Sequence, residues 1–307
     1  MTDGSRKAIL AAFFANLGIS IAKFVGFILT SSAGLLAEAG HSLADTGNQA
    51  LLLLGGKRAR READTDHPFG YGRERYFWAF VVALVLFSMG GLFALYEGIS
   101  KVRDPHEVDS LGIAVGILVV AICLETFSLR TAYREAKHHK APGVSWWKYI
   151  RTSKQPELPV VLLEDIGAEI GLFLALSGVL LAEVTDNPRW DAVGSISIGV
   201  LLVAIAIVLA IEMKGLLIGE SASPTDADTI RTSLEGSPSV RRIIHLKTQH
   251  LGPEELLVAA KLEFEPDLTV DDLTAAINGA ETNLRSALPT ARVVYLEPDV
   301  YRPTPVT

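Results

Sequence analysis

Cysteine is almost missing from this chain of 307 residues, in which Cys123 is the only one. A single thiol excludes an intramolecular disulfide framework and a metal cluster built on cysteines. Cys123 lies in an apolar stretch, where a free cysteine most often packs as a small hydrophobic side chain. Excess positive charge is also missing: the formal net charge is −7 at pH 7, so nothing in the composition suggests nucleic-acid binding.

Hydrophobic residues, in contrast, make up 49% of the chain. A helix that crosses a bilayer needs about 20 mostly apolar residues, and six stretches are long enough. We therefore expect a bundle of six transmembrane helices, with the first apolar stretch belonging to the mature protein. The six stretches are Ala8–Leu29, Ser32–Leu54, Tyr76–Ile99, Leu111–Leu129, Leu158–Leu181 and Ala192–Leu216.

The distribution of lysine and arginine predicts the orientation of this bundle. With a cytoplasmic N-terminus, the segments on the inner side carry 15 of these cations and the outer loops carry only three, Lys101, Arg103 and Arg189. Short cytoplasmic loops are enriched in lysine and arginine. We therefore expect a multi-pass protein of the cell (inner or plasma) membrane with both termini in the cytoplasm.

The composition changes after Leu216, and the rest of the chain is polar and acidic. Residues 1–218 are accordingly predicted to form the membrane domain, and residues 219–307 a cytoplasmic domain. The second part is predicted to begin with a helix from Pro224 to near Gly236, followed by strands and a second helix in the order αββαβ. This is a small two-layer α+β fold of the ferredoxin-like or metallochaperone-like kind. The expected strands are Arg242–His250, the segment whose inward residues are Val258, Ala260, Leu262 and Phe264, and Ala291–Glu297; the second helix carries Leu273, Ile277, Ala280 and Leu284.

The second apolar stretch contains a histidine and a carboxylate four residues apart, His41 and Asp45. Positions i and i+4 share one face of a helix, and Glu38 and Asn48 extend the same stripe. Each ionisable group at membrane depth costs about 2.5–3.5 kcal/mol on insertion scales, so such residues usually have a function. Imidazole and carboxylate are ligands for divalent cations.

The fifth stretch carries three carboxylates, Glu164, Asp165 and Glu169. Asp165 and Glu169 are i,i+4 neighbours, and Glu164 lies about 100° away from Asp165 around the helix. Buried neighbouring carboxylates repel, so we expect one to be protonated, hydrogen-bonded or paired with a cation. With His41 and Asp45 they could form a site of nitrogen and oxygen ligands that suits Zn²⁺ and, less selectively, Mn²⁺, Fe²⁺ or Co²⁺.

Plainer roles remain open for these polar residues. His41 and Asp45 could form a hydrogen-bonded pair that holds two helices together. Lys23, Asn16 and Glu125 are expected to pair with one another or to line a water path. An enzyme is not expected, because His-x-x-x-Asp lacks the arrangement of a zinc protease and no nucleophile lies beside it.

Three segments resemble the cation diffusion facilitator family of metal-ion/proton antiporters. They are AEAGHSLADTGNQ at Ala37–Gln49, HPFGYGRER at His67–Arg75 and HLGPEELLVAAKLEF at His250–Phe264. The resemblance covers nearly the whole chain and implies six helices, cytoplasmic termini, a C-terminal domain that forms a homodimer, and no permanently bound cofactor. It implies efflux of a divalent metal, first of all Zn²⁺, with Mn²⁺, Fe²⁺ or Co²⁺ as alternatives. A metal-sensing or partner-binding subunit that transports nothing is the other reading.

The family's transport site uses one Asp/His-x-x-x-Asp pair in the second helix and one His-x-x-x-Asp pair in the fifth. The first pair corresponds to His41 and Asp45. If Asp165 takes the second aspartate position, the expected histidine falls on Val161, so the resemblance is to a divergent branch with a Glu-Asp pair in this helix. The missing fourth ligand would then come from Glu164, Glu169 or Asn48.

Two accessory metal sites of the family are incomplete here. In the loop after the second helix, Asp64 and His67 fit the pattern, but Tyr71 stands where a second histidine is expected. In the C-terminal domain His245 matches one ligand, Lys261 and Leu296 replace others, and Glu297 remains. The resemblance therefore implies a C-terminal domain that dimerises but binds metal weakly or not at all.

Overall fold

The computed structural model describes residues 3–30, 33–104 and 111–302, with side chains left out at residues 3, 29–30, 33–38, 40 and 41. The chain divides into two compact units. The first contains Met1–Arg61 and Glu74–Lys214, and the second contains Glu62–Arg73 and Gly215–Thr307. Each unit is considered by itself.

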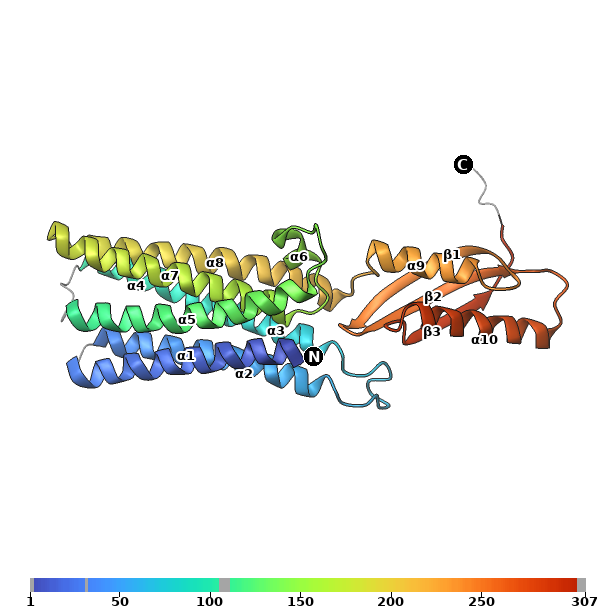
Figure 1. Cartoon of the computed structure of the whole chain (residues 1–307), viewed down its shortest axis with the longest axis horizontal. Helices are drawn as coiled ribbons and strands as arrows, with labels where there is room; N and C mark the ends of the chain where they lie inside the picture. Colours follow the sequence, from blue (N-terminus) through green and yellow to red (C-terminus); the bar gives the residue numbers. More distant parts are fainter. Residues whose placement is uncertain (1–2, 31–32, 105–110, 303–307) are drawn as a thin grey trace. The chain divides into compact units, whose positions relative to one another are not determined.

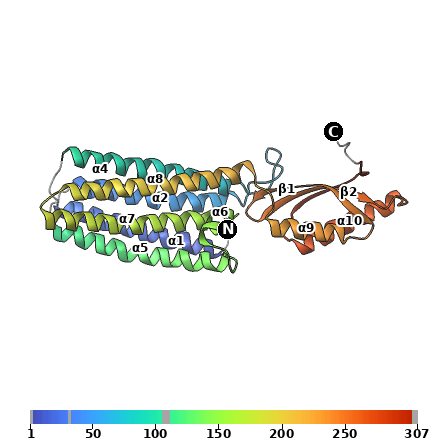
Figure 2. The ribbon, with the colours of Figure 1, turned by 90° about the horizontal axis from the view of Figure 1, so that it is seen from above.

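The first unit is a bundle of long helices that run along one another (Figures 1 and 2). Helix α1 packs against α2, α5 and α7, and α7 also contacts α3 and α5. A short helix, α6, follows α5 and begins at Ser145, whose hydroxyl accepts a hydrogen bond from the backbone N–H of Lys148. The helices are α1 (Asp3–Thr30), α2 (Ala33–Arg58), α3 (Glu74–Val85), η1 (Leu86–Leu92), α4 (Phe93–Arg103), α5 (Leu111–His139), α6 (Trp146–Thr152), α7 (Glu157–Thr185) and α8 (Arg189–Ile218).

Within the described residues, five helical segments are long and apolar enough to cross a membrane. They are Gly4–Ile28, Glu74–Arg103, Leu111–His139, Glu157–Thr185 and Arg189–Ile218. The sixth expected span, α2, is a helix of 26 residues, but it is not among the five. Its glycines and polar residues, beside Glu38 and Asp45, lower its hydropathy. The fourth predicted span, Leu111–Leu129, lies within helix α5, which continues ten residues past Leu129, to His139.

Glycines bring the third and sixth predicted spans into close contact. The third span contains a π-helical turn, η1, between α3 and α4. A Cβ atom at Gly98 would lie 2.8 Å from the backbone nitrogen of Ile196, and one at Gly199 would lie 2.8 Å from that of Leu95. These distances leave no room for a side chain, so only glycine allows α4 and α8 to approach this closely.

Replacement of Gly199 by valine is therefore expected to destabilise the bundle by about 1–3 kcal/mol, the usual cost of overpacking. Gly116→Val is a matched control, because no atom lies within 4 Å of the position of its Cβ. Thermal unfolding of the purified protein in detergent measures the difference. Equal melting temperatures for the two variants would contradict the close contact.

The second unit contains a three-stranded sheet and two helices (Figure 1). Strands β1 and β2 form an antiparallel hairpin, and β3 pairs with β2 in parallel after the crossover helix α10. Both helices begin with a capping hydroxyl: Ser223 accepts from the N–H of Asp226, and Thr269 accepts from that of Asp272. The elements are α9 (Pro224–Glu235), β1 (Val240–Gly252), β2 (Glu255–Phe264), α10 (Val270–Ala287) and β3 (Val293–Pro298).

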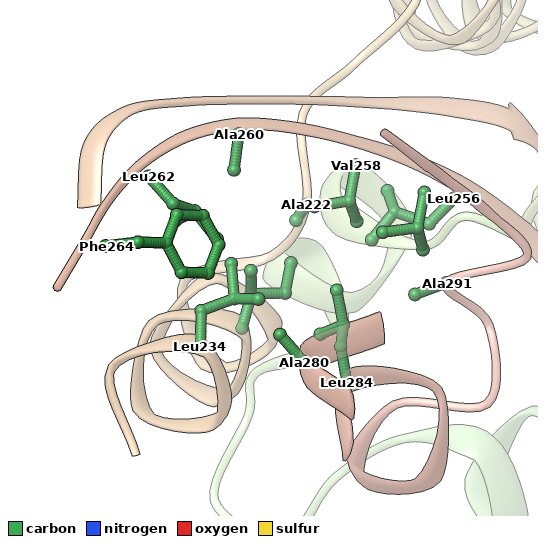
Figure 3. Packing of buried hydrophobic residues seen from close by; sticks show 12 residues of the cluster. Ala222, Leu234, Leu256, Val258, Ala260, Leu262, Phe264, Ala280, Leu284 and Ala291 are labelled. Carbon is green, nitrogen blue, oxygen red and sulfur yellow. The ribbon is translucent and has the colours of Figure 1, made fainter. Parts of the chain in front are cut away.

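One face of the sheet packs on both helices and forms the core of this unit (Figure 3). The alternation predicted for the second strand is confirmed, since Val258, Ala260, Leu262 and Phe264 are all buried. On the helices, Leu234 and Leu284 are fully buried against them. The helices and strands also follow each other in the expected order, and the bounds that were predicted differ by at most two residues.

The loop Glu62–Arg73 belongs to the second unit and packs on the turn between β1 and β2. A Cβ atom at Gly72 would lie 2.8 Å from the carbonyl oxygen of Leu251 and 3.0 Å from the Cα atom of Gly252. Two of the three motifs that carry the family resemblance therefore touch each other at a pair of glycines.

Candidate metal site

Helices α2 and α7 are linked through the carboxylate of Glu164. The side-chain amides of Asn48 and Gln49 each donate a hydrogen bond of 2.8 Å to it, Asn48 to Oε1 and Gln49 to Oε2. All three side chains are buried. Both oxygens of Glu164 are thus occupied by donors from α2, so this residue connects the two helices.

The next residue on α7, Asp165, points towards α5 instead. The hydroxyl of Ser128 donates a hydrogen bond of 2.8 Å to Oδ2 of Asp165, which is fully buried. One turn later, Thr126 donates a bond of the same length to Oε1 of Glu169. The 100° step between adjacent helical residues explains why Glu164 and Asp165 face different helices. Hydrogen bonds, as expected from the sequence, stabilise these neighbouring carboxylates.

Glu125 on α5 joins this group of carboxylates. Its side chain is buried, and it interacts electrostatically with Asp165, Asp45, Glu164 and Glu169. Helices α2, α5 and α7 therefore together surround five acidic side chains. We call Asp45, Glu125, Glu164, Asp165 and Glu169 the acidic cluster.

The structure brings four of the five predicted site residues together. Asp45 is half-buried on α2 and lies within the acidic cluster, as do Glu164, Asp165 and Glu169. The backbone of α2 includes His41, but its side chain lies outside the described residues. Among the described side chains, no three histidine, cysteine, aspartate or glutamate residues already form a group that could hold a metal ion.

Sequence analysis did not assign Glu125, Gln49 or Ser128 to this group. It expected Glu125 to pair with Lys23 or Asn16 or to line a water path, whereas the strongest charged neighbours of Glu125 are carboxylates. A periodic signal was available: Ala121, Glu125, Ser128 and Ala132 share the buried face of α5. Small residues at this spacing indicate the face that packs against another helix.

The loop before α3 is organised around Asp64. Its Oδ1 accepts hydrogen bonds from the backbone N–H groups of Asp66 and His67, and its Oδ2 accepts one of 2.6 Å from the hydroxyl of Tyr71. The rings of His67 and Tyr71 lie with their centroids 4.4 Å apart. The carboxylate of Asp64 thus accepts hydrogen bonds from donors of its own loop. Tyr71, one of these donors, stands at the position where the family has a second histidine.

These hydrogen bonds hold the pKa of Asp64 below its usual range. The bond from the Tyr71 hydroxyl has the largest effect, followed by the bond from the backbone N–H of His67. A depressed pKa stabilises the folded loop above the unfolded value of about 3.9, and the contribution is lost as pH falls through the folded pKa. Tyr71→Phe is expected to raise the pKa of Asp64 towards that value. Carbon-detected NMR titration of aspartate-labelled protein measures it; an unchanged pKa would exclude the role of Tyr71.

In the second unit, Lys261 replaces a ligand of the metal site that other members of the family have in their C-terminal domain. It lies opposite His245 on β1 and opposite Glu297 on β3. Its ammonium group is 2.9 Å from Glu297 Oε1 and 3.2 Å from Asp299 Oδ2. These bonds raise the pKa of Lys261, so a fixed cation stands beside Glu297.

Comparison with known proteins agrees with the helical part of this description. Residues 9–218 match the family model of the cation efflux transmembrane domain. The chain is 34% identical over 263 residues to "Proton-coupled zinc antiporter SLC30A9, mitochondrial" of Xenopus laevis, covering 85% of this chain and 47% of that protein. It is 26% identical to "Zinc transporter ZitB" of Pectobacterium atrosepticum, with coverages of 83% and 75%. It is 25% identical to "Magnetosome protein MamB" of Magnetospira sp. (strain QH-2), with coverages of 91% and 92%.

The chain spans about half the length of the antiporter it matches. Among solved structures, "MamM-CTD 215-293" aligns with 25% of this chain and 96% of that chain, at 16% identity and a TM-score of 0.24. The family model, in contrast, covers more than half of the chain. The chain is a multi-pass membrane protein and belongs to the cation efflux family of metal transporters, the cation diffusion facilitators.

Proposed function

We propose that this protein exports a divalent metal cation, with Zn²⁺ as the first candidate, in exchange for protons. The observation that carries the proposal is the acidic cluster, which lies on α2 and on two helices long and apolar enough to cross a membrane, α5 and α7. Intramembrane ionisable residues are costly and usually mark the path of an ion. In this proposal His41, Asp45 and Asp165 bind the metal as substrate, and one further carboxylate completes the site.

Proton coupling follows from the chemistry of the same groups. Carboxylates bind metal only when they are deprotonated, so binding of the metal releases protons. When the metal leaves, several buried carboxylates close to one another cannot all keep their charge without a compensating cation. Protons from the side to which the metal is released neutralise these carboxylates. They leave the carboxylates again when the next metal ion binds.

The choice of metal rests on the relatives and on the ligand types. Two of the relatives compared here are named as zinc transporters. Imidazole favours Zn²⁺ over hard cations, whereas carboxylates also suit Mn²⁺. Zn²⁺ therefore leads, and Mn²⁺, Fe²⁺ and Co²⁺ remain alternative substrates of the same site.

The rest of the proposal concerns the setting of the site. Helix α2 also crosses the membrane, which gives residues 1–218 six spans in total. Both termini lie in the cytoplasm. Alternating access arises from rocking of the helices. Residues 219–307 hold a homodimer together. Their sheet works without a bound metal, because Lys261 already pairs with Glu297 and Asp299.

The test is metal flux in proteoliposomes with an imposed pH gradient and an encapsulated metal-sensitive dye. The four metals are compared, and a protonophore removes the gradient in a parallel sample. We expect Zn²⁺ flux that falls when the gradient is removed. Absence of flux for all four metals, with a folded protein, would refute the proposal and favour a metal-sensing subunit that transports nothing.

A further inference from the structure

We infer that Glu125 on α5 is the fourth ligand of the transported metal, in the place that the sequence assigned to Glu164 or Glu169. This inference rests on the proposed function, since it completes the same site. It also accounts for Val161, which stands where the family has a ligand histidine in the fifth span.

Glu164 is the weaker candidate because two amides already donate hydrogen bonds to its carboxylate. Its two oxygens each accept a hydrogen bond of 2.8 Å from a buried amide of α2. Each oxygen keeps a second lone pair, so these bonds do not exclude a metal, but they already stabilise the charge of Glu164. Glu164 therefore needs a cation less than a buried carboxylate without such donors does. The geometry therefore gives Glu164 a structural role between α2 and α7.

Glu125, in contrast, has a buried carboxyl group on α5. Its strongest charged neighbours are Asp165, Asp45, Glu164 and Glu169. A buried carboxylate among other carboxylates needs a partner to carry charge. A divalent cation between Glu125 and Asp165 would supply one for both residues.

Asp165 presents the complementary free atom. Ser128 occupies its Oδ2, while Oδ1 is buried and has no hydrogen-bond partner among the described residues. Ser128 and Glu125 are three residues apart on α5, so both lie on the face that meets Asp165. Ser128 thus orients Asp165 and leaves one oxygen for the metal.

Glu169 is the third carboxylate to weigh. Its Oε1 accepts a hydrogen bond from Thr126, a residue on the exposed side of α5, and its Oε2 is buried without a hydrogen-bond partner among the described residues. Glu125 itself is almost fully buried, at 1% exposure. A site that excludes water and lipid is more easily completed by Glu125 than by Glu169.

The inferred set is one imidazole from His41 and three carboxylates from Asp45, Glu125 and Asp165. Oxygen ligands are better suited to Mn²⁺ than imidazole is. A site with one imidazole should therefore discriminate less sharply between Zn²⁺ and Mn²⁺ than a site with two. The ligand count thus predicts measurable Mn²⁺ competition for Zn²⁺ binding.

The test is Zn²⁺ binding by the purified full chain in detergent, measured by calorimetry against a competing chelator. Glu125→Gln keeps the shape of the side chain and is expected to weaken binding by at least about tenfold, since even indirect contacts to a metal ligand contribute 10–100-fold. Glu164→Gln should weaken binding less. Glu212→Gln is the control, because this carboxylate on α8 pairs with Arg151 and not with the acidic cluster.

The outcomes separate this inference from the proposed function. Zn²⁺ binding by Glu125→Gln equal to that of the parent would overturn the inference, and a larger loss in Glu164→Gln would return Glu164 to the site. If the parent neither binds nor transports Zn²⁺ or the three other metals, the proposed function fails as well. Glu125→Asp keeps the charge, so partial recovery of binding, with the melting temperature of the parent, supports direct ligation.

Discussion

Asp165→Asn is expected to abolish metal flux, reducing it at least about 100-fold, while the protein keeps its fold. Removal of an indirect contact to a metal ligand already costs 10–100-fold in metal affinity or activity, and loss of the ligand's charge should exceed that. Asparagine has nearly the same shape, and its amide oxygen can still accept the hydrogen bond of Ser128. The variant therefore removes charge from the buried site without opening a cavity.

The proteoliposome assay measures this loss, with Glu212→Gln as the control for general effects of removing a carboxylate from a membrane helix. The Asp165 variant should elute as the same species as the parent and melt at a similar temperature. Flux within a few-fold of the parent would show that Asp165 does not bind the ion. In that case the metal would have to be held by α2 and α5 alone.

Loss of either partner of the Arg75–Glu157 ion pair is expected to destabilise the bundle by about 3–5 kcal/mol, because it leaves an uncompensated buried charge. Arg75 lies in the first turn of α3 and Glu157 in that of α7. Both side chains are buried; Nε of Arg75 contacts Oε1 of Glu157, and its Nη2 donates a bond of 2.8 Å to Oε2. A bidentate pair of this kind fixes the two helix ends against each other.

Single variants Arg75→Met and Glu157→Leu should therefore lower the melting temperature in detergent strongly. The double variant tests the reason, since replacing both members of a buried pair by apolar residues is often close to neutral. It should recover most of the lost stability. A double variant that is as unstable as the sum of the two single variants would mean that the residues act independently.

The helices and strands could be predicted largely from local patterns. Alternating apolar residues identified β2, and Pro224 and Gly236 marked the ends of α9, because capping and turn residues act over a few positions. The apolar stretch alone did not predict where α5 ends, since its last ten residues are mostly polar or charged and continue the helix beyond that stretch. Hydropathy reports where a chain can be buried in lipid, whereas helix length depends on hydrogen bonds that continue past it.

The acidic cluster could be predicted only in part. The spacing of His41 and Asp45 identified α2, and the three carboxylates identified α7, because each pattern lies on one helix. Glu125 stands alone among apolar residues, so only the packing of α5 on α7 brings it to Asp165. The roles of Asn48 and Gln49 were equally hidden, since a hydrogen bond between residues more than 100 positions apart leaves no local signal.

The low hydropathy of α2 bears on how the chain enters the membrane during synthesis. As the proposed sixth span, α2 carries polar groups whose partners on α7 are made more than 100 residues later. Until then, the amides of Asn48 and Gln49 lack their acceptor, and exposing such groups to lipid is costly. We therefore expect α2 to insert stably only after α7 has been synthesised, so that a chain truncated before α7 should leave α2 accessible to water-soluble labelling reagents.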